Sequence, residues 1–144
     1  TIALAESCSG GYIAHLITSV AGASEYFSGC VVAYSNEMKQ SLLGVSPADI
    51  EKHGAVSSQV VEQMALGIQK NTGADYAIAT SGIAGPGGGT DEKPTGMVWI
   101  AWAGPDKKAV SKVFHLGKER SRNIVRTSET ELIELMQMMK KGVL

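Results

Sequence analysis

Residues 1–22 have the sequence TIALAESCSGGYIAHLITSVAG, in which a short apolar run leads through a polar turn with two glycines into a second apolar segment. The first six residues have the length and composition of a buried strand. After the glycine pair, apolar residues recur at helical spacing as far as Gly22, which ends the predicted helix. A strand that passes directly into a helix is the first unit of an α/β fold.

The same alternation of strands and helices continues along the chain. Further strands are predicted at about 29–34, 76–81, 97–103 and 110–116, and helices at about 36–43, 47–53, 58–72 and from 121 onward. Strands separated by helices imply parallel crossovers, whereas the Gly-Pro-Asp turn at 104–106 predicts an antiparallel hairpin of the last two strands. The sequence therefore predicts a three-layer α/β/α sandwich around a mixed, mostly parallel five-stranded sheet.

Composition narrows the class of protein. The chain has 144 residues, 44% of them hydrophobic and 19% charged, with a net charge of -1. This size fits one domain, and the charge balance disfavours broad binding to nucleic acid or to an anionic membrane. No apolar run has the roughly 20 residues of a membrane span, and no signal peptide opens the chain. We expect one cytoplasmic domain that lacks N-terminal residues or a preceding domain, because the chain begins inside its first strand.

Three polar segments follow predicted strands, at residues 6–11, 34–39 and 80–90. In open α/β sheets, binding sites form where strands end in loops at the carboxyl edge. We therefore expect these three segments to converge on one site.

The first segment, Glu-Ser-Cys-Ser-Gly-Gly, contains candidate nucleophiles. Ser7 or Ser9 could attack a substrate if a neighbouring group removed its proton, or both could only cap the helix. The N–H groups at the helix start could hold an anion or a developing oxyanion. Cys8, flanked by apolar strand residues, is expected to be buried and inert.

The second segment contains a candidate base. Lys39 falls in the first turn of a predicted helix, and a desolvated lysine there can act as a general base toward a serine hydroxyl. The alternative is a lysine on a solvated helix face. Tyr34 can relay or donate a proton, and Asn36 can orient it.

The third segment, residues 80–90, is rich in glycine and lacks the Gly-Lys-Ser/Thr ending of a nucleotide-triphosphate loop. Its amides and hydroxyls could hold a phosphate or an amide, or the segment could be a surface loop. Arg122 and Arg126, one helical turn apart in the last helix, could clamp one phosphate or form a solvated basic face. The three histidines lie in different segments without a zinc-type motif, so we expect no metal.

Taken together, these segments resemble one family. The stretches at 5–11, 32–39, 53–57, 81–88 and 93–96 are similar to the C-terminal domain of CinA, the competence-damage-inducible protein. Stand-alone bacterial members of this family are nicotinamide-nucleotide amidohydrolases. The resemblance implies hydrolysis of nicotinamide mononucleotide to nicotinic acid mononucleotide and ammonia, in pyridine nucleotide salvage and without a cofactor. We also expect a homo-oligomer.

The resemblance also implies roles for particular residues. Ser7 would be the nucleophile, with Lys39 as its base and Tyr34 assisting. The other implied positions are the oxyanion amides of Ser9, Gly10 and Gly11, and a substrate pocket lined by Asn36, Thr80, Ser81 and Gly82.

One departure concerns the phosphate. The family usually has Gly-Asp-Arg before the last helix, whereas residues 117–122 here are Gly-Lys-Glu-Arg-Ser-Arg. We favour Arg122 as the phosphate ligand, because of its spacing to Arg126. The alternative function is a non-catalytic nucleotide-binding or assembly domain of a longer CinA-like chain.

Overall fold

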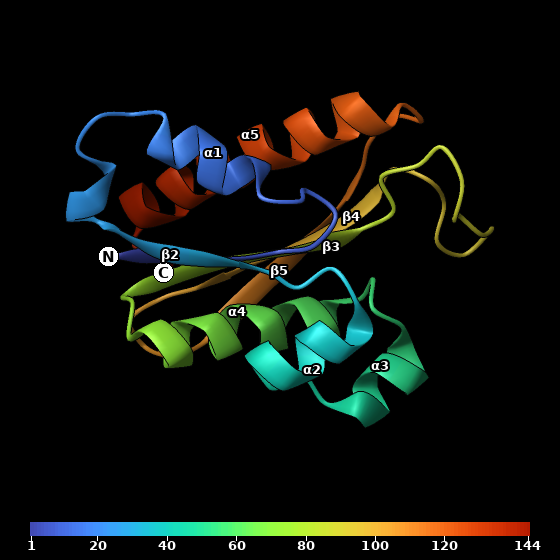
Figure 1. Ribbon diagram of the computed structural model, residues 1–144, viewed down its shortest axis with the longest axis horizontal. Helices are drawn as coiled ribbons and strands as arrows, with labels where there is room; N and C mark the ends of the chain where they lie inside the picture. Colours follow the sequence, from blue (N-terminus) through green and yellow to red (C-terminus); the bar gives the residue numbers. More distant parts are fainter.

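Small and β-branched residues dominate the strands of this chain, and they assemble into one central sheet. The computed structural model describes residues 1–144 and shows five strands in the order β2-β1-β3-β4-β5 (Figure 1). The strands are β1 (Ile2–Glu6), β2 (Phe27–Val32), β3 (Tyr76–Gly82), β4 (Met97–Ala103) and β5 (Ala109–His115).

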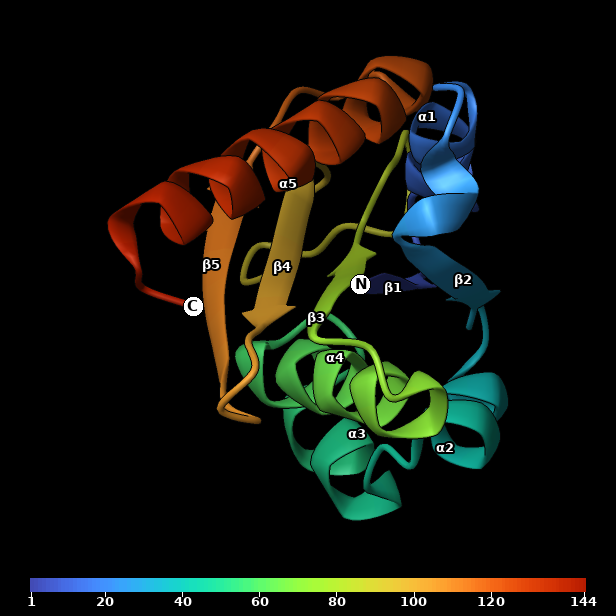
Figure 2. The same cartoon turned by 90° about the vertical axis from the view of Figure 1, so that its left-hand side faces the viewer.

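Helices cover both faces of the sheet. The α-helices are α1 (Tyr12–Thr18), α2 (Asn36–Leu43), α3 (Pro47–His53), α4 (Ser58–Thr72) and α5 (Arg120–Lys141), with a 3-10 turn, η1 (Ala23–Glu25), before β2. α1 and α5 lie on one face, and α2, α3 and α4 lie on the other (Figure 2). The predicted three-layer sandwich is confirmed.

The sheet is mixed, as predicted. β1 pairs in parallel with β2 and β3, whereas β4 pairs antiparallel with both β3 and β5, so β4 alone runs against the other four strands. The sequence predicted only the β4–β5 hairpin as antiparallel. β3 and β4 form a second antiparallel pair, because residues 83–96 between them contain no crossover helix and return the chain at the same edge.

The two faces of the sheet carry side chains of different size. Alanines of β1, β3 and β4 face the layer of α4, while larger residues, among them Leu4, Ile78, Ile100 and Trp102, face α1 and α5. This difference follows from the alternation of side chains along a strand. The alanine face lets α4 pack close to the sheet, and α2 in turn packs against α4. No helix has the length and apolar character needed to cross a membrane.

Candidate active site

Ser7 and Lys39 meet at the carboxyl edge of the sheet. Ser7 follows β1 directly, and Lys39 lies in α2, whose first turn is capped by the Ser35 hydroxyl accepting from the Met38 N–H. Lys39 Nζ donates hydrogen bonds to Ser7 Oγ at 3.0 Å and to the carbonyl oxygen of Ala33 at 2.8 Å. Two segments 32 residues apart in the chain thus form one hydrogen-bonded pair.

The environment of Lys39 favours its neutral form. The side chain is only 2% exposed and takes part in none of the salt bridges. Burial away from water lowers the pKa of Lys39 below its ordinary value of 10.5. This burial excludes the interpretation of Lys39 as a lysine on a solvated helix face. A neutral amine at hydrogen-bond distance from a serine hydroxyl can accept its proton.

Ser7 and Lys39 face a cavity of about 210 Å³ that residues from all three predicted segments line. Its lining consists of Ser7, Cys8, Tyr34, Asn36, Lys39, Ala55, Val56, Ser81, Gly82, Ala84 and Arg120. The expected convergence of the three segments is therefore present. Ser81 Oγ donates to the carbonyl oxygen of Ala55 at 2.7 Å, which ties β3 to the connection between α3 and α4.

Tyr34 lines the same cavity but does not contact Ser7 or Lys39 by a hydrogen bond. Its side chain is exposed, and its hydroxyl accepts a hydrogen bond from Arg120 Nη2 at 2.7 Å. Arg120 Nη1 donates to the carbonyl oxygen of Gly85 at 3.0 Å. Arg120 therefore links Tyr34, which lines the cavity, to the glycine-rich loop that contains Gly85.

Thr80 and Ser9 do not line the cavity. Both are buried, and their hydroxyl oxygens are 3.0 Å apart. Thr80 Oγ1 also accepts from the Ser7 N–H at 3.4 Å. Because Thr80 contacts both Ser7 and Ser9, it supports the turn that follows β1.

The amides of Gly10 and Gly11, predicted as oxyanion donors, are already engaged. The Gly10 N–H donates to the Ser7 carbonyl at 3.1 Å, and the Gly11 N–H donates to Glu6 Oε2 at 2.8 Å. The N–H groups of Cys8 and Ser9 have no acceptor in another residue. Of these two residues only Cys8 lines the cavity, so the turn offers the Cys8 amide to a ligand there.

Glu6 explains why the start of α1 is closed to an anion. Its buried carboxylate accepts from the N–H groups of Gly11, Ile13 at 3.3 Å and Ala14 at 2.8 Å. A carboxylate at a helix N-terminus satisfies donors that the helix itself leaves unpaired. Sequence analysis assigned no role to Glu6. The available signal was its place at the end of an apolar strand, because a glutamate is rarely buried unless its carboxylate is paired.

Both cysteines are free thiols, of which Cys8 is buried and Cys30 is half-buried. Burial, reinforced by Glu131, raises the pKa of Cys8 to about 12, and burial together with the charge of Glu6 raises that of Cys30 to about 12. A thiol with such a pKa stays protonated and unreactive at neutral pH. The prediction that Cys8 is buried is confirmed, and its inertness stays a prediction that the raised pKa supports.

The arginines of α5 divide between two surfaces. Arg122 Nε pairs with Glu119 Oε2 at 3.0 Å, and Arg122 and Arg126 line a separate surface hollow of about 330 Å³. Neither lines the cavity of Ser7, whereas Arg120 does. Positions two apart on a helix differ by about 200° in direction, so Arg120 and Arg122 face opposite sides of α5. Sequence spacing identified a pair on one face but did not show which face meets the site.

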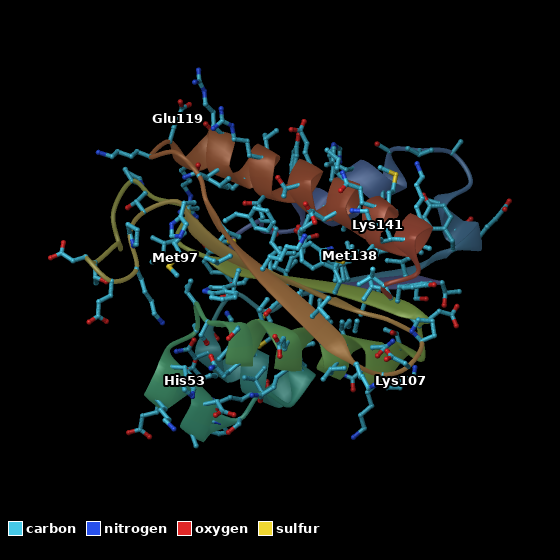
Figure 3. The ribbon with its side chains drawn as sticks, turned by 180° about the vertical axis from the view of Figure 1, so that it is seen from behind. His53, Met97, Lys107, Glu119, Met138 and Lys141 are labelled. Atoms are coloured by element: carbon cyan, nitrogen blue, oxygen red, sulfur yellow. The ribbon has the colours of Figure 1, made fainter.

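In Figure 3, Glu119 at the start of α5, Met97 at the start of β4 and His53 at the end of α3 are spread along one end of the molecule, whereas Lys107 in the β4–β5 hairpin lies toward the other end. At this end a larger hollow of about 680 Å³ adjoins the site, because Arg120 lines both. The hollow is further lined by Pro86, Lys118, Glu119, Ser121 and Ile124.

Known proteins resemble this chain over nearly its whole length. The model of the CinA C-terminal domain matches residues 1–139. A CinA-like protein of Cytophaga hutchinsonii is 48% identical over 143 residues, which are 99% of this chain and 34% of that protein. One from Rippkaea orientalis is 47% identical over 127 residues, 88% of this chain and 30% of that protein. The chain thus spans about a third of the length of these curated relatives.

Solved structures have the same fold. The competence/damage inducible protein CihA from Agrobacterium tumefaciens superimposes with a TM-score of 0.93 at 37% identity, covering 96% of this chain and 84% of that one. The competence damage-inducible protein A from Klebsiella pneumoniae has a TM-score of 0.93 at 33% identity, covering 96% and 86%. This chain therefore belongs to the family of CinA C-terminal domains.

Proposed function

We propose that this domain is an amidohydrolase that removes ammonia from the carboxamide of nicotinamide mononucleotide. The observation that carries the proposal is the contact of 3.0 Å between Lys39 Nζ and Ser7 Oγ, in which the lysine is buried and has no anionic partner. A module that only binds nucleotide has no need for a neutral amine beside a hydroxyl that faces a cavity.

The contacts support a two-step reaction. Lys39 accepts the proton of Ser7, and Ser7 Oγ attacks the carboxamide carbon to give a tetrahedral oxyanion. The N–H group of Cys8, which has no acceptor in another residue and belongs to a residue that lines the cavity, is the donor available to that oxyanion. Lys39 then passes its proton to the departing nitrogen, which leaves as ammonia from an ester on Ser7. Water hydrolyses the ester, yielding the carboxylic acid and free Ser7.

The two adjoining hollows suit the two ends of a nucleotide. The cavity of about 210 Å³ is smaller than the roughly 300 Å³ of sites that take drug-sized ligands, so it holds only part of such a substrate. We place the pyridine carboxamide there and the ribose phosphate in the hollow of about 680 Å³, where Lys118 and Arg120 supply positive charge. Arg120 thereby replaces Arg122 as our candidate for the phosphate ligand.

Ammonia release from nicotinamide mononucleotide tests the proposed function. The wild-type domain should release ammonia, and Arg120→Ala should raise the KM by roughly ten- to a hundredfold, since a charge-assisted contact contributes about 1.5–3 kcal/mol. Arg122→Ala is the matched control, because Arg122 lies outside both hollows and pairs with Glu119. Failure of a folded wild-type domain to release any ammonia would reject the proposal.

A second candidate is a nucleotide-binding or assembly domain without catalysis. The observation in its favour is that the curated relatives are about three times as long as this chain, which leaves room for another domain to do chemistry in them. Saturable binding of nicotinamide mononucleotide, observed by calorimetry without release of ammonia, would favour this second candidate.

A further inference from the structure

The hydroxyl of Tyr34 forms no hydrogen bond with Ser7 or Lys39. It lines the cavity with Ser7 and Lys39, yet its hydrogen bond is to Arg120 Nη2 at 2.7 Å. The contact joins residues 86 positions apart and bridges the connection before α2 to the first residue of α5. Since the Tyr34 side chain is 59% exposed, little packing holds it in this position.

Arg120, the partner of Tyr34 in this contact, forms no salt bridge. Its guanidinium binds the Tyr34 phenol and the carbonyl oxygen of Gly85. Arg122, two positions along, is paired with Glu119 at 3.0 Å. A phosphate brings a negative charge and can accept two parallel N–H bonds from one guanidinium, whereas the neutral phenol accepts one such bond. An anion in the hollow beside Arg120 would therefore compete effectively with the phenol.

We propose that the hydrogen bond between Arg120 and Tyr34 is a latch that the phosphate of the substrate opens. This inference rests on the proposed function. The phosphate enters the larger hollow and takes over the guanidinium, and Tyr34 is then free to turn toward Ser7 and Lys39. There its hydroxyl can relay the proton between Lys39 and the departing nitrogen.

With such a latch, the phosphate of the substrate raises kcat as well as the affinity of binding. A ligand shifts a conformational equilibrium only by its difference in affinity for the two states, and here that difference is the new contact with Arg120. Binding energy from a part of the substrate remote from the amide is thereby used to assemble the site. Without its phosphate, the substrate would enter the small cavity and find Tyr34 still held by Arg120.

Nicotinamide riboside together with phosphite dianion tests the latch, because the two pieces make up the substrate without a covalent link. In the wild type, phosphite should raise kcat for the riboside by on the order of tenfold. Arg120→Ala should abolish this activation, and the control Arg122→Ala should retain it. Tyr34→Phe should also abolish it, and the KM of this variant for the mononucleotide should not rise, because the phosphate then meets no competing phenol at Arg120. A riboside that matches the mononucleotide in kcat and shows no response to phosphite would overturn the proposal.

A second readout does not depend on turnover. The chain has four tyrosines, and comparison with Tyr34→Phe assigns the ring signal of Tyr34 in an NMR spectrum of the labelled protein. Inorganic phosphate should shift that signal in the wild type and in Arg122→Ala but not in Arg120→Ala. If the mononucleotide is not hydrolysed while the shift is observed, the proposed function fails and the latch stands. If phosphate leaves the Tyr34 signal unchanged, the latch is rejected whatever the activity.

Discussion

At the scale of single residues, Lys39 combines burial without an anionic partner, which lowers its pKa and so favours a neutral amine, with a hydrogen bond to a serine hydroxyl. Lys39→Arg keeps a positive charge but cannot lose its proton, because a guanidinium stays charged at any ordinary pH. We expect Lys39→Arg to be as inactive in ammonia release as Lys39→Ala. Thermal unfolding of both variants checks that they fold, and full activity of a folded Lys39→Arg would reduce Lys39 to a positive charge in the cavity.

The activity should depend on pH through the same amine. A general base works only in its deprotonated form, and burial lowers the pKa of Lys39 from 10.5. We therefore expect kcat/KM to rise with pH and to level off below pH 10.5. Measurement of kcat/KM from about pH 6 to about pH 10 tests for this rise. A flat profile over that range would mean that Lys39 does not act as the base.

Ser7 and Cys8 are adjacent nucleophile candidates with opposite expectations. Burial raises the pKa of the Cys8 thiol to about 12, so little thiolate exists at neutral pH. Ser7→Ala should remove nearly all turnover and leave the fold intact, whereas Cys8→Ala should retain turnover. Steady-state ammonia release from the two variants decides between them. Loss of activity in a folded Cys8→Ala, with Ser7→Ala still active, would refute the serine mechanism.

At the scale of elements, the position of Lys39 depends on how closely α2 packs against α4. A Cβ added at Gly67 in α4 would lie 2.0 Å from the carbonyl oxygen of Leu43, the last residue of α2. Alanine ordinarily stabilises a helix interior by about 1 kcal/mol relative to glycine, but overpacking costs about 1–3 kcal/mol. Gly67→Ala should therefore lower the unfolding free energy and also reduce kcat, because it displaces the helix that carries Lys39.

Urea unfolding and ammonia release measure both effects in the same variant. Gly87→Ala is the matched control, since a Cβ at Gly87 meets nothing within 4 Å. Its unfolding free energy should stay close to that of the wild type. A Gly67→Ala variant that is more stable than the wild type would show that α2 moves away from α4 at little cost.

The elements also show how far the sequence could predict the site. Helical periodicity identified α1, α2 and α4, and glycine stops ended α2 and α4 correctly, whereas α1 ends at Thr18, before the predicted stop at Gly22. The carboxyl-edge rule brought Ser7, Tyr34 and Lys39 to one edge of the sheet. These features depend on local patterns that a single segment carries. The pairing of β3 with β4 and the hydrogen bond from the Gly11 N–H to Glu6 depend on how the chain folds back on itself. No local sequence pattern could therefore predict them.

Arg120 shows the same limit for a side chain. Three arginines open α5, and their spacing reveals which of them share a face. Which face turns toward the site depends on how α5 packs against the sheet and α1, and this is a property of the tertiary structure. The residue that meets Tyr34 was therefore visible in the sequence only as one member of a basic cluster.

At the scale of the whole molecule, the sheet separates the reactive lysine from a second buried ionisable group. Lys39 reaches the site from the layer of α2 and α4, whereas Glu131 lies in α5 on the opposite face, fully buried (Figure 2). Neither carboxyl oxygen of Glu131 has a hydrogen-bond partner. Burial, together with the charge of Glu6, raises the pKa of Glu131 well above its ordinary value of 4.5. Burial therefore favours the protonated form of Glu131 in the folded protein.

This buried acid should make the fold less stable as pH rises. The unfolded chain ionises Glu131 above about pH 4.5, while the folded chain keeps the proton, so the folded state binds more protons in that range. Each pH unit between the two pKa values then costs about 1.4 kcal/mol of unfolding free energy. Glu131→Gln cannot ionise and should lose this dependence, so its advantage over the wild type should grow as the pH rises above 4.5 toward the raised pKa of the folded state.

Urea unfolding at several pH values measures the difference between the two curves. Glu129→Gln changes an exposed carboxylate of the same helix and is the matched control, because exposed charges contribute little to stability. Its curve should run parallel to that of the wild type. If the curve of Glu131→Gln also runs parallel, the carboxyl of Glu131 ionises in the folded protein as it does in the unfolded chain. It must then have a partner, such as buried water, at the polar face that α5 turns toward the sheet.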